Sequence, residues 1–98
     1  MSGKPQFIAS EEDWIIWILG EDPANHVALG DLSSRMERTP EHVLPMLRIL
    51  KRRGAVTLAG ADPGGSMETE VGLAPIGTAI YTRLKGLASS YRNTKKFV

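Results

Sequence analysis

The sequence contains no cysteine and only two histidines. The absence of cysteine excludes disulfides, thiolate catalysis and cysteine-ligated zinc. His26 and His42 are far apart in the chain, and no Ser, His and acidic grouping or carboxylate pair has the spacing of a catalytic or metal site. We therefore predict no catalytic residue, no metal site and no cofactor, and do not expect an enzyme.

Long hydrophobic runs are also missing. No apolar stretch approaches the roughly 18 residues of a membrane-spanning helix, so no membrane contact is expected. The first residues, MSGKPQF, lack the apolar segment of a signal peptide, which together with the absence of cysteine favours a cytoplasmic protein. The 98 residues, 42% hydrophobic and 23% charged, fit a single globular domain.

Net charge is close to zero, at +1, but it is distributed unevenly along the chain. Residues 1–34 hold one basic and six acidic residues, a net −5, whereas residues 35–53 hold six basic and two acidic residues, a net +4. Residues 54–75 carry −3 and residues 76–98 carry +5. Basic blocks of this kind attract a polyanion such as DNA, while a solvated surface without that role is the alternative for any single cluster.

The stretch 27–58 has the pattern of two short helices joined by a tight turn. Apolar residues recur there at spacings of three and four, at Leu29, Leu32 and Met36 and again at Val43, Leu47 and Leu50. Thr39 is a suitable N-cap, and Pro40 fits the first helical position, where its missing N–H is not needed. With Gly54 ending the second helix, the pattern indicates a helix-turn-helix.

Four further elements flank this motif. Ser10 caps a helix over residues 11–19, and residues 26–29 predict a very short strand. Residues 55–60 and 67–73 read as two strands of a hairpin around the turn ADPGGSM. Pro75 opens a last helix. We expect a flexible arm over residues 1–9, the domain over 10–91 and a basic tail that frays over 92–98.

This order of elements is that of a winged helix-turn-helix, an α+β fold, mainly α, with a three-helix core, a two-stranded β wing and a C-terminal helix. The run DLSSRMERTPEHVLPMLRILKRRGAV resembles MarR-type and related archaeal and phage winged-helix transcriptional regulators. The run VGLAPIGTAIYTRL is similar to the segment after the wing in these families, normally Leu-Thr-x-x-Gly. Leu73 and Gly77 match that segment, and Ala74 replaces the threonine. The resemblance covers about residues 11–88.

The resemblance implies sequence-specific binding of double-stranded DNA by a small transcriptional regulator, with a recognition helix at about 40–53 in the major groove. A helical projection turns one side of this helix outward, presenting Glu41, His42, Pro45, Arg48, Ile49 and Arg52 next to the capping Thr39. Arg48 is suited to guanine, Glu41 to a cytosine amino group, and Pro45 or Ile49 to a thymine methyl.

Phosphate contacts are expected from arginines around this helix, at Arg35, Arg38, Arg52 and Arg53. For Lys51 and Arg53, complementing the helix dipole in solvent is an equally good explanation.

Two departures from the family pattern favour a second hypothesis. Pro45 lies inside the recognition helix, where it costs about 3 kcal/mol unless the helix bends or begins later. The expected wing tip holds Asp62, Gly64, Gly65 and Glu68 but no lysine or arginine. The alternative is a winged helix for protein interaction without sequence-specific DNA binding, and a small enzyme or ligand-binding domain is a third class. Salt-dependent binding to duplex DNA distinguishes the first hypothesis from the others.

A homodimer is predicted from the apolar run Trp14–Leu19, which covers every side of its helix, so that no single core face takes all of it. The resemblance implies dimerisation through terminal helices, here residues 11–19 and 75–91. The predicted interface consists of aromatic and aliphatic residues of both, Trp14, Trp17, Ile80, Tyr81, Leu84 and Tyr91. Such a dimer sets two recognition helices roughly 34 Å apart. The sequence identifies no small-molecule effector.

Overall fold

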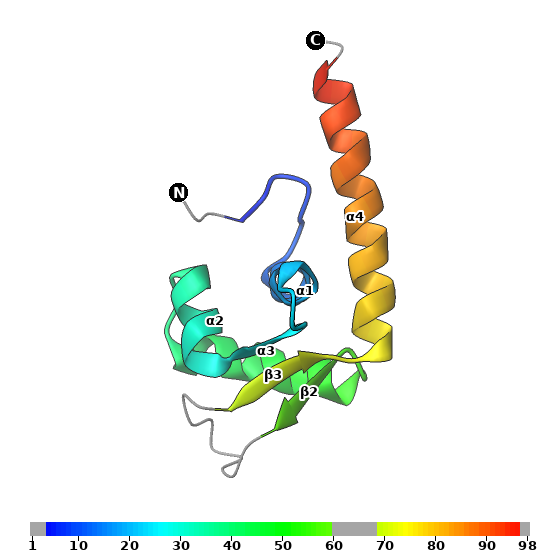
Figure 1. The fold of residues 1–98 in the computed structure, drawn as a ribbon. Helices are drawn as coiled ribbons and strands as arrows, with labels where there is room; N and C mark the ends of the chain where they lie inside the picture. Colours follow the sequence, from blue (N-terminus) through cyan, green and yellow to red (C-terminus); the bar gives the residue numbers. More distant parts are fainter. Residues whose placement is uncertain (1–3, 60–68, 97–98) are drawn as a thin grey trace.

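Within residues 4–59 and 69–96, which the computed structural model describes, with side chains as far as residue 90, the chain forms four helices and three short strands. Their order is α1 (Glu11–Glu21), β1 (His26–Ala28), α2 (Leu29–Met36), α3 (Pro40–Arg52), β2 (Val56–Ala59), β3 (Glu70–Leu73) and α4 (Pro75–Lys96). Figure 1 shows α2 on one side of α1 and α4 on the other, with α3 and the sheet below. This arrangement confirms the predicted fold class.

The sheet has the strand order β1-β3-β2, with β3 antiparallel to both neighbours. The hairpin of β2 and β3 was expected, and in the structure Val56 lies opposite Leu73. The sequence did not predict that β1 pairs with β3. His26 lies opposite Gly72 in that second pairing. The pairing of β1 with β3 joins the start of α2 to the base of the wing, where the Leu29 amide also donates to the Thr69 carbonyl at 2.8 Å.

Helix α1 lies at the centre of the fold, between the other helices and the sheet (Figure 1). It begins at Ser10, whose hydroxyl accepts a hydrogen bond from the Asp13 amide at 3.2 Å. In its run of six consecutive apolar residues, four are buried, namely Trp14, Ile15, Ile16 and Leu19. The other two, Trp17 and Ile18, are half-buried. The chain's own elements thus take up most of this run, and Trp17 and Ile18 keep part of their surface exposed.

The segment before α1 also contributes to the core. Ile8 is only 1% exposed, and its amide donates to the Pro5 carbonyl at 3.1 Å. The Phe7 ring meets the Trp17 ring edge-on at 4.9 Å between centroids. Phe7 and Ile8 of the expected flexible arm are thus packed against the core, and the boundary of the domain at residue 10 stays a prediction.

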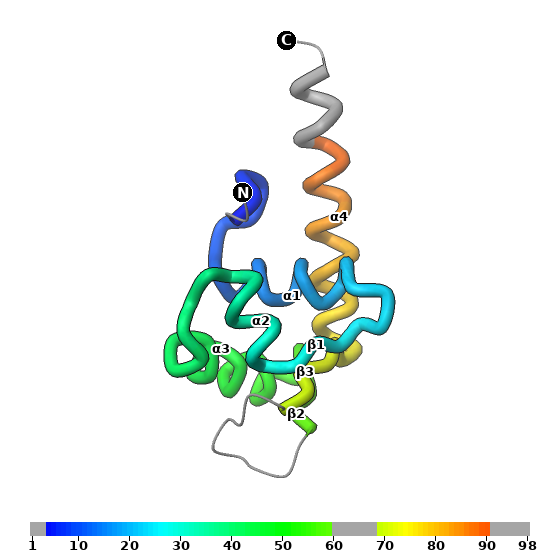
Figure 2. The backbone as a smooth tube through the Cα atoms, turned by 60° about the vertical axis from the view of Figure 1, so that its left-hand side comes forward, coloured from blue at the N-terminus to red at the C-terminus, as the bar shows by residue number. Residues whose placement is uncertain are grey.

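Helix α4 is the longest element, and its 22 residues give a length of about 33 Å. Leu84 and Ala88 on it are buried, at 2% and 4% exposure, while Ile76 and Leu87 are 52% and 48% exposed. In Figure 2 the orange part of α4 lies beyond the other helices and the sheet. The backbone stays helical to Lys96, so the residues expected to form a fraying tail begin inside this helix. Among the described residues, no helix combines the length and apolarity needed to cross a lipid bilayer.

Candidate nucleic-acid interface

Helix α3 has a defined start and a defined end. The Thr39 hydroxyl accepts a hydrogen bond from the His42 amide at 3.2 Å, and Pro40 takes the first helical position. Gly54, at φ +79°, turns the chain out of the helix, and the Ala55 amide donates back to the Leu50 carbonyl at 2.9 Å. A left-handed residue at this place is a common helix ending and favours glycine. Both caps follow from the sequence, and they fix which α3 residues face solvent.

The buried and exposed faces of α3 agree with the helical projection of the sequence. Val43, Leu47 and Leu50 are buried, at 0%, 0% and 3% exposure. The opposite side exposes every residue that the projection turns outward, namely Glu41, His42, Pro45, Arg48, Ile49 and Arg52. Ile49 is 39% exposed, which is unusual for so large an apolar side chain. Their role toward DNA stays a prediction.

Pro45 lies within the single helix Pro40–Arg52, so the helix neither stops at it nor begins after it. Proline cannot donate to the carbonyl four residues earlier, which belongs to Glu41. Glu41 is exposed, so water can bond that carbonyl, and the three buried residues hold α3 against the core.

The turn between α2 and α3 is set by Glu37, which adopts the left-handed conformation with φ 56°. The Arg38 amide then donates to the Ser33 carbonyl at 3.0 Å, which closes the end of α2. This closure leads the chain directly into the Thr39 cap. The sequence predicted a polar connection here but not its left-handed residue, because glutamate is uncommon in that conformation.

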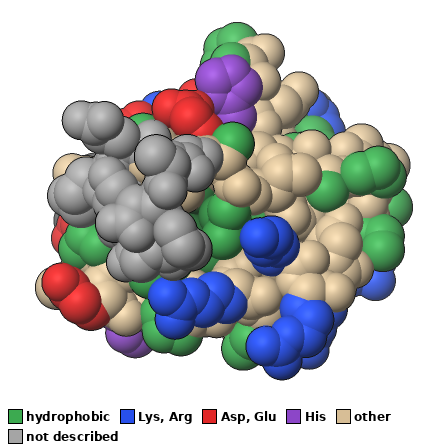
Figure 3. All heavy atoms as spheres, turned by 90° about the horizontal axis from the view of Figure 1, so that it is seen from below, with side chains coloured by type: hydrophobic (Ala, Val, Ile, Leu, Met, Phe, Trp, Pro, Cys, Tyr) green, Lys and Arg blue, Asp and Glu red, His purple; other side chains and the backbone are tan. Residues whose placement is uncertain are grey.

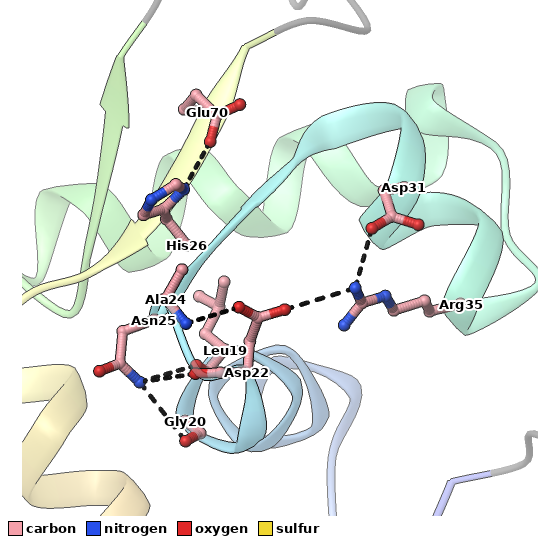
Figure 4. A network of polar contacts seen from close by, with 9 residues as sticks. All are labelled: Leu19, Gly20, Asp22, Ala24, Asn25, His26, Asp31, Arg35 and Glu70. Atoms are coloured by element: carbon pink, nitrogen blue, oxygen red, sulfur yellow. Dashed lines mark hydrogen bonds and ion pairs between the residues drawn. The ribbon is translucent and has the colours of Figure 1, made fainter.

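Arg35 and Arg38, two of the four proposed phosphate contacts, are paired with carboxylates. Figure 4 shows Arg35 between Asp31 and Asp22, at 2.9 and 3.4 Å from its Nη2 atom. Arg38 donates from Nη2 to Glu11 at 3.2 Å. The spacing of four residues between Asp31 and Arg35 is a signal in the sequence that could have indicated this ion pair. The partners Asp22 and Glu11 stand 13 and 27 residues away, so only the fold brings them close.

Asp22 is held in place by the loop after α1. Its Oδ1 atom accepts from the Ala24 amide at 2.9 Å, which leaves Oδ2 for Arg35 (Figure 4). In the same loop Asn25 adopts a left-handed φ of 58° and donates from its side-chain Nδ2 atom to the Leu19 carbonyl at 3.1 Å. The loop thus closes α1 and positions a carboxylate for α2.

The remaining Lys and Arg residues of the basic stretch 35–53 lie toward the carboxyl-terminal end of α3. Arg48, Lys51, Arg52 and Arg53 are all exposed there. Figure 3, which views the molecule of Figure 1 from below, shows Lys and Arg side chains on this face. Lys51, Arg52 and Arg53 form no ion pair with another described residue. Positive potential on this face is therefore concentrated at one end of α3.

Both histidines contact a glutamate. His26 Nδ1 lies 2.7 Å from Glu70 across the sheet (Figure 4), and His42 Nε2 lies 3.2 Å from Glu11. The hydrogen bond from Arg38, together with the weaker one from His42, holds the pKa of Glu11 below its ordinary value of 4.5. Glu11 is thus ionised at neutral pH. In the described part of the chain, no three His, Asp or Glu side chains are grouped so that they could hold a metal ion.

The predicted dimer residues occupy different environments in the single chain. Trp14 and Leu84 are core residues, at 6% and 2% exposure, whereas Trp17 and Ile80 are half-buried. The Tyr91 side chain lies outside the described residues.

Tyr81, another predicted dimer residue, already has partners within its own chain. Its ring lies 5.4 Å from that of Trp17 and rests against Gly20, where an added Cβ would collide with it. The phenol donates to Glu21, and this bond raises the pKa of Tyr81. Tyr81 therefore joins α4 to the end of α1.

The wing tip, residues 60–68, lies outside the described residues, and so do the acidic Asp62 and Glu68 predicted for it. The base of the wing is described as β2 and β3.

No protein-family model and no curated protein matches the sequence. Solved structures do match. They include AbsC, a MarR family transcriptional regulator from Streptomyces coelicolor, at TM-score 0.74, 12% identity and 93% coverage of this chain. A MarR repressor from Listeria monocytogenes follows at TM-score 0.72, 20% identity and 92% coverage.

The S. aureus MepR–DNA complex aligns at TM-score 0.71 and 19% identity over 94% of this chain and 74% of that one. This chain spans only 62% of AbsC and 60% of the Listeria protein. At these identities the likeness concerns the fold. The chain therefore has the winged helix-turn-helix fold of MarR-family regulators.

Proposed function

We propose that this chain binds double-stranded DNA as a transcriptional regulator, with α3 in the major groove. The observation that carries the proposal is the cationic end of α3, where Arg48, Lys51, Arg52 and Arg53 are exposed on one capped helix. A helix with this placement in a helix-turn-helix is suited to a groove flanked by phosphates. The S. aureus MepR structure, which has a similar fold and has been solved as a complex with DNA, supports binding to DNA.

Within this proposal, the contacts divide by chemistry. Arg52 and Arg53 meet phosphates, whereas Arg48 reads guanine and Glu41 a cytosine amino group. Pro45 and Ile49 offer apolar contact to a thymine methyl. Arg35 and Arg38 remain proposed phosphate contacts, but each must share its guanidinium with a carboxylate. Thr39 and His42 complete the set at the start of α3.

Arg52→Ala is expected to weaken binding to all duplex sequences alike. Each neutralised phosphate contributes about −0.9 to the slope of log affinity against log salt, so this variant reduces the slope by about that amount. Anisotropy titrations of random duplex between about 50 and 200 mM salt measure it. Arg83→Ala, which removes an exposed cation from α4, is the matched control and leaves the slope close to that of the wild type. If the unmodified chain shows no binding near 100 µM at low salt, the DNA-binding proposal fails.

Arg48→Ala is expected to relax sequence preference at one base pair and to cost roughly 1–3 kcal/mol on the preferred site. Random DNA is much less affected, because a bidentate contact to guanine is made only where guanine stands. Selection from a randomised duplex pool with both proteins gives the two preferences directly. An unchanged preference removes Arg48 from base readout.

A protein-interaction module is the second candidate, favoured by the 39% exposure of Ile49 beside the exposed Pro45. Apolar side chains at the centre of a presented helix suit a protein partner as well as a base edge. Weak binding to DNA that does not change with salt is the outcome that selects this candidate.

We further propose that the chain acts as a homodimer through α1 and α4, with the domain at residues 10–91. The exposed Ile76 and Leu87 on α4 support this arrangement more directly than the tryptophans do, because their surfaces are free in the single chain. A two-fold axis between two α4 helices sets the two α3 helices on the same side of a duplex.

A further inference from the structure

Glu11 connects three elements that follow one another around the proposed DNA surface. It is the first residue of α1, and its Oε2 atom accepts a hydrogen bond from Arg38 Nη2 in the turn before α3. Its Oε1 atom lies at the same distance, 3.2 Å, from His42 Nε2 in the first turn of α3. The Glu11 carboxylate thus contacts two side chains, those of Arg38 and His42, that we propose to face DNA.

The Glu11 carboxylate has two described side-chain partners. Arg38 is its one permanent cation, and His42 is its second partner. Glu12 and Asp13 share its helical turn but have no ion pair with a described residue. The side chains of Glu11 and Arg38 are 29% and 41% exposed, so a phosphate can reach the pair from solvent.

The two ends of α3 therefore differ in what they offer a phosphate. At the carboxyl-terminal end Lys51, Arg52 and Arg53 are exposed and have no acidic partner among the described residues. At the amino-terminal end a phosphate meets a guanidinium already bonded to a carboxylate, and the carboxylate repels it.

We propose that Glu11 is an internal counter-ion that competes with DNA phosphate for Arg38 and His42, and so lowers the affinity of this surface for DNA. The inference rests on the proposed DNA-binding function and adds the regulation of that site. Binding at the turn then requires exchange: the carboxylate releases the Arg38 N–H, and a phosphate oxygen accepts it. Glu11 acts through Arg38 and His42, as a positioning residue.

The effect is limited in size because the pair is partly exposed. Exposed ion pairs of this kind change equilibria by factors of up to about five. Glu11→Gln is expected to bind random duplex about three- to fivefold more tightly than the wild type at about 100 mM salt. The salt slope steepens by up to about 0.9, because Arg38 becomes available for one more phosphate.

Glu12→Gln is the matched control. It makes the same change in net charge, in the same first turn of α1, at a carboxylate without an ion-pair partner among the described residues. Any long-range electrostatic gain is common to both variants, so the difference between them measures the local exchange. Equal affinities for the two variants would overturn the inference while leaving DNA binding intact.

A double-mutant cycle tests whether Glu11 acts through Arg38. Most of the gain from Glu11→Gln is expected to vanish in an Arg38→Ala background, which a merely structural role of Glu11 does not predict. Weaker binding by Glu11→Gln at unchanged melting temperature would instead mean that Glu11 presents Arg38 to the phosphate, and the proposed competition fails.

Glu11→Asp provides a second variant if Glu11→Gln folds poorly. It keeps the charge at the start of α1 but draws the carboxylate back by one methylene, and it is also expected to tighten binding. If neither the wild type nor any variant binds duplex at low salt, the proposed function fails and this inference fails with it.

Discussion

Leu87→Glu is expected to turn the proposed dimer into a monomer and to lower DNA affinity by about 100-fold. Leu87 is 48% exposed on α4, between the buried Leu84 and Ala88. A charge placed at the centre of an apolar interface has no partner there and opposes association. Two linked half-site contacts gain a factor of 10² or more over one through effective concentration, and the monomer loses that gain.

Leu87 is a better site for this test than the predicted interface residue Tyr81. The Tyr81 ring rests on Gly20 and its hydroxyl donates to Glu21, so a substitution there also loosens α4 from α1 in the same chain. Leu87 is exposed enough to be changed with little effect on the fold.

Ser89→Glu is the matched control for Leu87→Glu. It introduces the same charge two residues further along, on a different side of α4, at a position that is already polar and exposed. Sedimentation velocity at tens of micromolar reports the assembly of each protein. A wild-type chain that sediments as a monomer, or a Leu87→Glu chain that stays dimeric, contradicts the proposed interface.

The sequence predicted the local elements well because each has its own signal. Ser10 and Thr39 cap their helices as expected, and Gly54 supplies the left-handed residue that ends α3. These signals operate over three or four residues, within the reach of hydrogen bonds between near neighbours. The outward face of α3 follows as well, since helical spacing alone decides it.

Contacts between distant residues were missed for a physical reason. The pairing of Glu11 with Arg38 spans 27 residues, and that of β1 with β3 joins His26 to Gly72. No local pattern encodes either, because the choice of partner depends on how the helices pack. Sequence analysis therefore counted Arg38 as an available cation. It also did not predict that Ile8 and the neighbouring elements of the same chain cover most of the apolar surface of α1.

The close approach of α4 to the end of α3 is another such contact. Gly77 was recognised only as a match to the segment after the wing. In the structure an added Cβ at Gly77 would lie 2.1 Å from the Ala55 carbonyl oxygen and 2.9 Å from a Leu73 methyl. The Ala55 carbonyl also accepts from the Ala74 amide at 3.0 Å. The first turn of α4 is thus seated on the backbone that follows Gly54.

Gly77→Ala is expected to destabilise the chain by about 2–3 kcal/mol, because a methyl group at 2.1 Å from a backbone oxygen forces α4 away from Ala55. The figure is net of the gain of up to about 1 kcal/mol that alanine brings to a helix. For a domain of this size it corresponds to a fall in Tm of roughly 10–20 °C. Thermal unfolding followed by circular dichroism at fixed protein concentration measures it.

Gly86→Ala provides the comparison that separates crowding from helix propensity. Gly86 lies on the same helix, and an added Cβ there meets nothing within 4 Å, so this variant is expected to be as stable as the wild type or more so. If both variants melt alike, α4 is not seated on Ala55 as described. If only Gly77→Ala is destabilised, the first turn of α4 is seated on Ala55 as described. In the proposed dimer, that contact couples the orientation of α4 to the position of α3.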